Sequence, residues 1–208
     1  MSLIAAALVG YLLGAIPFGL ILGRLIKGID LREYGSHRTG ATNALRTLGA
    51  RAAAVVFVLD VAKGVIAVLV GRAMGGDDPL WAAAVAGFAA IVGHNWSVFI
   101  GFTGGRGVAT SAGALAAVSP WTILVVFPVV ALVIWRSRYV SLGSIVGALL
   151  APIVTAGWVM LGQANVPAVA YALASGLLVT AAHADNIGRL RSGTERKIGH
   201  KEAVSTHG

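Results

Sequence analysis

A polar, glycine-containing stretch from Gly35 to Gly49 separates two long apolar runs and has the residue types that bind an anion. Hydroxyl, amide and guanidinium groups that can donate hydrogen bonds to an oxyanion are supplied by Ser36, Thr39, Thr42, Asn43, Arg38 and Arg46. Gly35 and Gly40 allow backbone N–H groups to turn toward a ligand, and residues 41–48 are expected to form a short helix whose N-terminus faces it. The stretch therefore predicts a phosphate cradle.

A glycine-rich turn, Gly104 to Gly107, is a second anion-binding candidate because an apolar helix is expected to begin at Val108. Free backbone N–H groups and the helix dipole favour an anion at such a place, and Arg106 adds a positive charge. His94 lies shortly before the turn, near the end of an apolar segment. It is either a core histidine with satisfied hydrogen bonds or a group that acts in the site.

Composition indicates an integral membrane protein. The chain has 208 residues, of which 57% are hydrophobic and only 12% charged, and its mean hydropathy is +0.84. The net charge of +8 fits cytoplasmic loops beside anionic lipids better than a nucleic-acid partner. The absence of cysteine excludes disulfides and thiolate chemistry. Residues 1–26 have no basic leader or convincing cleavage site, so they indicate a first membrane span.

The apolar segments predict an all-α protein with about seven transmembrane helices, its N-terminus outside and its C-terminus in the cytoplasm. Residues 108–135 are either one bent span or two short antiparallel pieces that turn at Ser119-Pro120. Loop charge favours the second, because it places Arg136 and Arg138 on the cytoplasmic side. The other expected spans are Leu3–Ile26, Ala52–Met74, Leu80 to about Phe102, Ser141–Met160 and Pro167–Ala182.

Two features inside these spans are open to a packing or a functional interpretation. Pro17, between Gly14 and Gly19, is expected to bend the first helix where small residues let another backbone approach. Asp60 and Lys63 lie about one helical turn apart in the second span, so they can pair on one face. This pair either fixes helix packing or acts indirectly beneath the polar site.

In this topology the polar stretches converge on the cytoplasmic face; they are residues 35–49, 94–107, 141–144 and 183–197. A transporter would more naturally place polar groups near the bilayer midplane. The pattern favours an enzyme that meets water-soluble and lipid-like substrates at the membrane surface. A small-anion or lipid-intermediate transporter remains the alternative.

The chain resembles the bacterial acyl-phosphate-dependent glycerol-3-phosphate acyltransferases in motifs that cover nearly its whole length. The matching segments are Gly14–Gly19, Asp30–Arg32, Gly35-Ser36, Gly40–Asn43 with Arg46, Asp60–Gly64, Gly93-His94, Gly104–Thr110, Val140–Ser144 and His183–Lys197. The resemblance implies an acyl phosphate donor, glycerol 3-phosphate as acceptor, lysophosphatidic acid and phosphate as products, and neither a metal, another cofactor nor coenzyme A. It implies a multi-pass protein of the bacterial cytoplasmic membrane, surrounded by membrane lipids, with its active site facing the cytoplasm.

Two departures from the family pattern keep positive charge near phosphate. The family usually has Gly-Ser-Gly-Asn where this chain has Gly35-Ser-His37-Arg38, and lysine where this chain has Arg106. The planar guanidinium is not equivalent to an ammonium. A paralogue with a changed donor or acceptor is therefore a further alternative.

An acyl phosphate is already activated, so the expected task of the site is to position two phosphates and a hydroxyl. For glycerol 3-phosphate the expected binding residues are Arg46, Ser36, His183 and Asn186. For the acyl phosphate they are Thr42, Asn43, Ser144 and the turn of Gly104, Gly105 and Gly107, with Gly40 in the cradle and Arg106 serving both substrates.

The hydroxyl proton has two candidate acceptors. His183 could take it with help from Asp185, or the leaving phosphate of the donor could take it, which is the preferred mechanism. Glu195 lies in the matching motif and is expected to orient basic neighbours.

Residues 1–200 are expected to form a single transmembrane acyltransferase domain and residues 201–208 a disordered tail. The sequence does not indicate an oligomeric state.

Overall fold

The computed structural model describes residues 3–199, and the regular secondary structure in this part is helical apart from one isolated bridge between Ser97 and Thr103. The predicted tail at 201–208 lies outside the described residues. The longer helices are α1 (Leu3–Ala15), α2 (Phe18–Lys27), α4 (Ala50–Met74), α5 (Pro79–Asn95), α6 (Val108–Val118), α7 (Pro120–Ser137), α8 (Val140–Met160) and α9 (Val166–Ala181). The shorter ones are α3 (Ala41–Thr47), α10 (Ala184–Arg191) and two 3-10 turns, Leu31–Glu33 and Val98–Ile100.

The helices are long and apolar enough for a multi-pass membrane protein. Within residues 3–199, four helical segments could cross a bilayer by length and composition, or up to five if α9 and α10, bent by 58°, form one span. The four are Leu3–Lys27, Ala50–Met74, Pro120–Ser137 and Val140–Met160. α5 has 17 residues and α6 has 11. The expected seven crossings therefore require these shorter helices to cross the bilayer as well.

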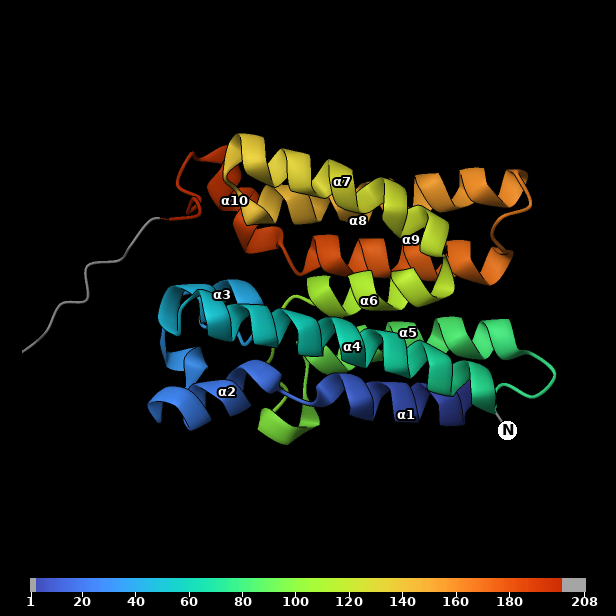
Figure 1. Cartoon of the computed structure of the whole chain (residues 1–208), viewed down its shortest axis with the longest axis horizontal. Coiled ribbons are helices and arrows are strands. Elements are labelled where there is room, and N and C mark those ends of the chain that lie inside the picture. The colour runs from blue at the N-terminus through green and yellow to red at the C-terminus, as the bar shows by residue number, and fades with distance from the viewer. Residues whose placement is uncertain (1–2, 200–208) are drawn as a thin grey trace, which may run out of the picture.

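The chain passes between the two ends of the bundle in alternating directions (Figure 1). α1 and α2 lead to the left-hand end, α4 returns, and α5, α6, α7, α8 and α9 continue the alternation. α4 packs against α5 and α6, and α8 packs against α7 and α9. As a result, the segments before α4, after α7 and after α9 lie at the left-hand end, and the segment after α5 lies in the same half of the bundle (Figure 1). The polar stretches were predicted to gather on one side in this way.

Small residues let α1 and α5 pack with their backbones in contact. A methyl group at Gly14 would overlap the backbone of Ala90, and one at Gly93 would overlap the carbonyl of Tyr11. The predicted bend at Pro17 is confirmed as a complete break between α1 and α2. Beyond the break, α2 ends at Lys27, and Gly28 caps it in the left-handed conformation with φ +68°.

The third apolar helix ends earlier than predicted, at Asn95 and not near Phe102. The Ser97 hydroxyl donates to the carbonyl oxygen of Ala15 at 2.5 Å, and the Ser97 amide donates to Thr103 O at 3.0 Å. Between Ser97 and Thr103 in the chain, Gly101 and Phe102 have φ of +70° and +56°. The chain therefore turns back on itself here, because tertiary hydrogen bonds replace the last helical turns.

The predicted break at Ser119-Pro120 is confirmed, and it separates α6 from α7. The Ser119 hydroxyl lies 2.8 Å from that of Thr122, which lies 3.0 Å from the hydroxyl of Thr155 on α8. Thr155 in turn donates to Ala151 O at 2.7 Å. All three hydroxyl residues are buried. This chain of hydrogen bonds satisfies polar groups at the end of the bundle opposite the polar stretches.

Candidate functional site

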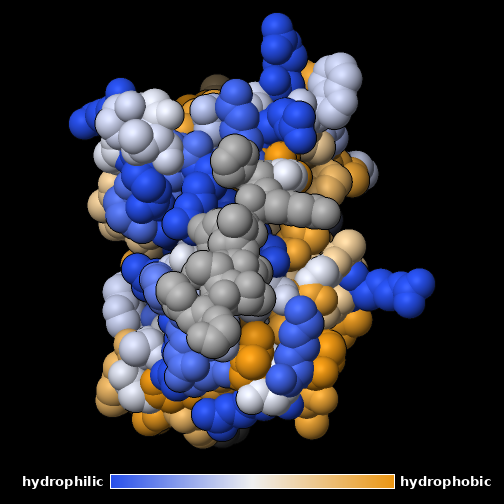
Figure 2. All heavy atoms as spheres, turned by 90° about the vertical axis from the view of Figure 1, so that its left-hand side faces the viewer, coloured by the Kyte–Doolittle hydropathy of each residue, from blue (hydrophilic) through white to orange (hydrophobic). Residues whose placement is uncertain are grey.

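A cavity of about 560 Å³ opens at the end of the bundle where the polar stretches meet. Its mouth is lined by polar residues of the segment 35–46, the glycine turn, the start of α8 and the segment 183–196. Figure 2 looks onto this end and shows hydrophilic side chains gathered on it, with apolar side chains at its sides. Distant polar segments of the sequence thus contribute to one site.

Nearly all the side chains and glycines predicted for the site line this cavity. The lining residues among them are Ser36, Gly40, Thr42, Asn43, Arg46, Gly105, Arg106, Gly107, Ser144, His183, Asn186 and Glu195. Gly104 does not line it, since its Cα faces the backbone of His94 and Asn95 so closely that a methyl group there would overlap the His94 carbonyl. Gly104 therefore packs the turn against α5.

The first loop is the segment between α2 and α3, residues 28–40. Asn43 stabilises the first loop through both polar atoms of its side chain. Its Nδ2 lies 2.9 Å from Leu31 O, 3.0 Å from Tyr34 O and 2.8 Å from Arg38 O. Its Oδ1 accepts from the backbone amide of Ser36 at 3.0 Å, and the residue is buried. Because these groups are already paired, the amide orders the cradle around Ser36 and has little capacity left for a ligand.

Arg106 is held at the mouth by two partners from the segment after α9. Its Nε donates to Ala182 O at 3.2 Å and its Nη2 to Asp185 Oδ2 at 2.7 Å. Burial raises the pKa of Asp185, but the charges of Arg106 and Arg189 outweigh this effect and lower the pKa below its ordinary value. The carboxylate is therefore ionised near neutral pH and fixes the guanidinium next to the glycine turn.

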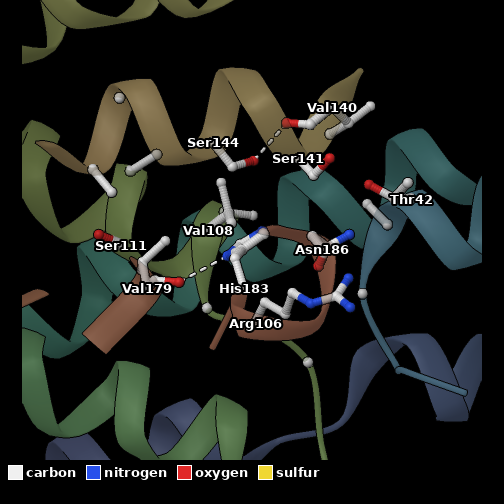
Figure 3. A pocket seen from close by; sticks show the side chains of 18 of the residues that line it. Thr42, Arg106, Val108, Ser111, Val140, Ser141, Ser144, Val179, His183 and Asn186 are labelled. Carbon is white, nitrogen blue, oxygen red and sulfur yellow. Dashed lines mark hydrogen bonds between the residues drawn. The ribbon is translucent and has the colours of Figure 1, made fainter. Parts of the chain in front are cut away.

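His183 has one ring nitrogen engaged and the other available. Its Nδ1 lies 2.7 Å from Val179 O, a carbonyl that can only accept, so Nδ1 carries the proton and Nε2 has a lone pair. Burial, together with the charge of Arg106, lowers the pKa of His183 and keeps the ring neutral. In Figure 3 His183 lies between Ser144 and Arg106, beside Asn186.

Asp185 pairs with Arg106 and with Arg189, at 2.7 and 3.3 Å, and not with His183. The structure therefore does not support help from Asp185 to His183, in line with the preferred mechanism, in which the leaving phosphate takes the proton. The reason is local geometry: α10 begins at Ala184, so side chains two residues apart point to different sides.

The Glu195 carboxylate accepts hydrogen bonds from three side chains at the mouth. Its Oε1 accepts from the hydroxyl of Ser141 at 2.8 Å and from Nδ2 of Asn186 at 2.7 Å, while its Oε2 accepts from Nε of Arg189 at 2.8 Å. Burial raises the pKa of Glu195, but the bonds from Arg189, Ser141 and Asn186 outweigh this effect and lower it. The expectation that Glu195 orients a basic neighbour is confirmed, and it also orients Asn186.

His37, one of the departures from the family pattern, has a left-handed backbone conformation with φ +55°. Glycine adopts this conformation without strain, which explains the glycine that the family usually has here. The His37 ring compensates in part, because its Nδ1 donates to Arg32 O at 2.9 Å. The substitution therefore keeps the loop shape and adds a side chain at the cavity mouth.

Behind the polar mouth the cavity continues as an apolar groove between α6, α7, α8 and α9. Its walls include Ala112 and Leu115 of α6, Val126 and Val130 of α7, and Ala151 of α8. Phe57 of α4 also lines it. One cavity therefore combines a mouth rich in basic residues with a groove suited to a hydrocarbon chain.

Comparison with known proteins assigns the chain to a family. Residues 4–193 match the family model described as glycerol-3-phosphate acyltransferase. The chain belongs to the glycerol-3-phosphate acyltransferase family. A relative from Synechococcus sp. (strain JA-3-3Ab), named glycerol-3-phosphate acyltransferase, is 47% identical over 205 residues, which cover 99% of this chain and 98% of the relative. Glycerol-3-phosphate acyltransferase 2 of Moorella thermoacetica is 45% identical over 196 residues, covering 94% and 97%.

A solved member of the glycerol-3-phosphate acyltransferase family has the same fold. The crystal structure of PlsY, described as an integral membrane glycerol 3-phosphate acyltransferase in its glycerol 3-phosphate form, superposes with a TM-score of 0.85. The two chains are 37% identical, and the match covers 96% of each. The lysophosphatidic acid form of PlsY gives a TM-score of 0.82 at the same identity and coverage.

Sequence reasoning singled out fewer lining residues than this site of a glycerol-3-phosphate acyltransferase contains. Polar lining residues that were not assigned to either substrate include His37, Arg38, Ser141, Asp185, Arg189 and Arg196, together with Asp60, His94, Ser111 and Ser175. Ser141 and Arg189 lie inside matching motifs. Their polar side chains within those motifs were the signal that could have marked them as lining residues. The apolar walls carried no such signal, because groove-lining side chains such as Val126 and exposed ones such as Leu124 are both apolar.

Proposed function

We propose that this chain transfers a fatty acyl group from an acyl phosphate to the 1-hydroxyl of glycerol 3-phosphate, in phospholipid biosynthesis. The products are lysophosphatidic acid and inorganic phosphate. The observation that carries the proposal is the continuity of a basic mouth with an apolar groove in one cavity. Membership of the family supports it, as does the likeness to PlsY in forms named for glycerol 3-phosphate and lysophosphatidic acid.

The groups at the mouth are suited to hold two phosphates close together. We assign the glycerol 3-phosphate headgroup to Arg46, Ser36, His183 and Asn186. We assign the acyl phosphate to Thr42, Ser144 and the turn at Gly105 and Gly107, its chain lying in the apolar groove, while Arg106 lies near both phosphates. Asn43 contributes by ordering the loop that carries Ser36.

In the reaction, the oxygen of the acceptor hydroxyl attacks the acyl carbonyl carbon and forms the new ester bond. The bond between that carbon and the bridging oxygen of the phosphate breaks, and the phosphate leaves with the electron pair. The hydroxyl proton goes to the departing phosphate, whose oxygens lie next to the attacking oxygen in such an arrangement. Fixed positive charges of Arg46 and Arg106 stabilise the charge that develops, so the residues mainly position and neutralise.

The test is release of inorganic phosphate from a long-chain acyl phosphate by purified protein in lipid, with and without glycerol 3-phosphate. We expect release that depends on the acceptor and falls about a hundredfold in the Arg46→Ala variant. Arg72→Ala is the matched control, because Arg72 is an exposed arginine in the last turn of α4, far from the mouth. Activity with acyl coenzyme A alone would indicate a changed donor, and transport of label without consumption of acyl phosphate would indicate a transporter.

We also propose that the chain crosses a bacterial cytoplasmic membrane about seven times, with the mouth on the cytoplasmic side. The basic residues near the mouth support this orientation, since the opposite end has the acidic turn with Asp77 and Asp78. The chain has no cysteine, so single cysteines can be placed at Asp77 and Ser192, both exposed. In intact cells a membrane-impermeant thiol reagent should label the variant at 77 and spare that at 192. The reverse labelling would contradict the orientation.

A further inference from the structure

A buried charged cluster lies beneath the mouth, and the reaction described above does not use it. It consists of Asp60 and Lys63 on α4 and His94 at the end of α5, with side chains 2%, 4% and 6% exposed. Lys63 Nζ lies 2.7 Å from Asp60 Oδ1 and 2.9 Å from His94 Nδ1, and it donates to Ile16 O at 3.0 Å. The ammonium, which can only donate, thus has two hydrogen-bond acceptors, Ile16 O and His94 Nδ1, and an ion pair with Asp60.

One of these acceptors lies at the break between α1 and α2. Pro17 has no amide hydrogen, so Leu13 O lacks its usual helical donor, and at the break Ile16 O accepts from the amide of Phe18 at 3.2 Å. Lys63 donates to Ile16 O, and its Nζ also lies 5.6 Å from the centre of the Phe18 ring. Just after the break, a methyl group at Gly19 would overlap Thr39 O. The break therefore places α2 directly against the loop that carries the first phosphate cradle.

The His94 ring lies directly under the glycine turn. Because Lys63 can only donate, His94 Nδ1 accepts, and the ring orientation is fixed from the Lys63 side. The backbone amide of Gly105 donates to His94 O at 3.0 Å. A methyl group at Gly105 would overlap the ring nitrogen Nε2. The turn that carries Arg106 is therefore in contact with both the backbone and the side chain of His94.

Stability alone does not account for this cluster. Removing charges from water costs roughly several kcal/mol per ion. Apolar residues of similar volume therefore often stabilise a protein as much as a buried ion pair does. Apolar residues do not provide an ammonium that donates to a carbonyl at a helix break and to a ring nitrogen while it is ion-paired with a carboxylate. These bonds link the two segments that form the phosphate cradle and the glycine turn.

We propose that the Asp60–Lys63–His94 cluster is a positioning device that holds the glycine turn and the first loop at the separation needed for two phosphates. The inference rests on the proposed function, because it assigns the turn to the acyl phosphate. Asp60 and His94 are among the residues that line the cavity, whereas Lys63 does not line it. The role proposed for the cluster is to orient the turn and the loop, and Lys63 acts through other groups. If the cluster is removed, the turn has more than one arrangement and binds the acyl phosphate less well.

The test replaces the cluster's charges as a pair. A single substitution would leave a buried charge unpaired and could prevent folding, so the variant is Asp60→Asn with Lys63→Met. We expect its KM for acyl phosphate to rise about tenfold while the KM for glycerol 3-phosphate changes less than about twofold. His94→Asn, whose Oδ1 can replace the Nδ1 acceptor but whose side chain lacks the ring, should show the same pattern.

The matched control is Thr122→Val, which removes a buried hydroxyl from the hydrogen-bonded chain at the opposite end of the bundle. It should lower the midpoint of thermal unfolding but leave both KM values unchanged. If the paired variant also loses thermal stability with unchanged KM values, the cluster is only a packing element and the inference is wrong.

Hydrogen exchange gives a second readout that does not require activity. In the paired variant we expect faster amide exchange in residues 103–107, which include the amide of Gly105 that bonds to His94 O. Exchange near Thr122 should be unchanged. Unchanged exchange at 103–107 would overturn the positioning role even if the wild type is active. Lack of acyl transfer by the wild type would instead contradict the proposed function, and the exchange result would still decide the inference.

Discussion

Asn186 donates from Nδ2 to Oε1 of Glu195 at 2.7 Å, and its Oδ1 is buried without a hydrogen-bond partner among the described residues. The ionised carboxylate can only accept, so the bond fixes which end of the amide faces Glu195. The free Oδ1 belongs to a residue that lines the cavity. A buried, unpaired acceptor is costly, and a hydroxyl of glycerol 3-phosphate would satisfy it.

The Glu195→Gln variant tests this orientation. A glutamine amide can donate as well as accept, so it no longer dictates the direction of the Asn186 amide. We expect the KM for glycerol 3-phosphate to rise about tenfold, equivalent to about 1.4 kcal/mol. Asp77→Asn, an exposed acidic residue at the other end of the bundle, is the control. Steady-state kinetics in lipid measure both, and an unchanged KM would show that the orientation of Asn186 is immaterial.

Replacement of His183 by glutamine separates binding from proton transfer. If the departing phosphate takes the proton, His183→Gln should keep a near-normal kcat at saturating substrate and raise the KM for glycerol 3-phosphate about tenfold. His183 Nε2 has a lone pair, so a role as base is chemically available. A fall in kcat of about a hundredfold or more with unchanged KM would establish that role and remove the preferred mechanism.

The same residue should make stability depend on pH. Burial, together with the charge of Arg106, lowers the pKa of His183 below its ordinary value of 6.5. The unfolded chain therefore binds a proton at a higher pH than the folded chain does, so stability falls as pH drops below 6.5 toward the folded-state pKa. Thermal unfolding of the wild type should show this loss, and His183→Gln should reduce it. Identical pH profiles would argue against the prediction.

The left-handed position at His37 predicts an order of stabilities. His37→Ala keeps the unfavourable backbone conformation and loses the bond to Arg32 O. His37→Gly loses the same bond but relieves the backbone. We therefore expect the glycine variant to be more stable than the alanine variant by about 1 kcal/mol, measured as the free energy of unfolding in detergent. An alanine variant as stable as the glycine variant would contradict the strain at residue 37.

Arg106 and Asp185 should be coupled in their effect on kcat/KM. Arg106 bonds both Ala182 O and Asp185, which an ammonium at that position cannot reproduce with the same geometry. Asp185→Asn should therefore reduce kcat/KM about threefold to tenfold in the natural chain, but much less in the Arg106→Lys background. A double-mutant cycle of the four proteins measures this coupling. Equal losses in the two backgrounds would show that Asp185 does not act through Arg106.

Several features follow from the sequence because they depend on local composition. The apolar length and the loop at Gly75 predicted a second span at residues 52–74, and α4 covers Ala50–Met74. Pro17 and Pro120 marked helix breaks because proline lacks the amide hydrogen that a helix needs. Motif order was enough to gather most of the candidate site at one end, since helices that alternate in direction bring every second loop to the same side.

The tertiary structure alone decided which polar groups far apart in the sequence are paired. α5 ends at Asn95 because Ser97 bonds to Ala15 O across the bundle, a contact between residues far apart in the chain. Likewise Asp185 bonds to Arg106 and not to His183. Hydrophobicity and propensity determine where helices form, but partner choice depends on which backbones approach closely. That approach is set in three dimensions, by contacts such as those of Gly14 and Gly105.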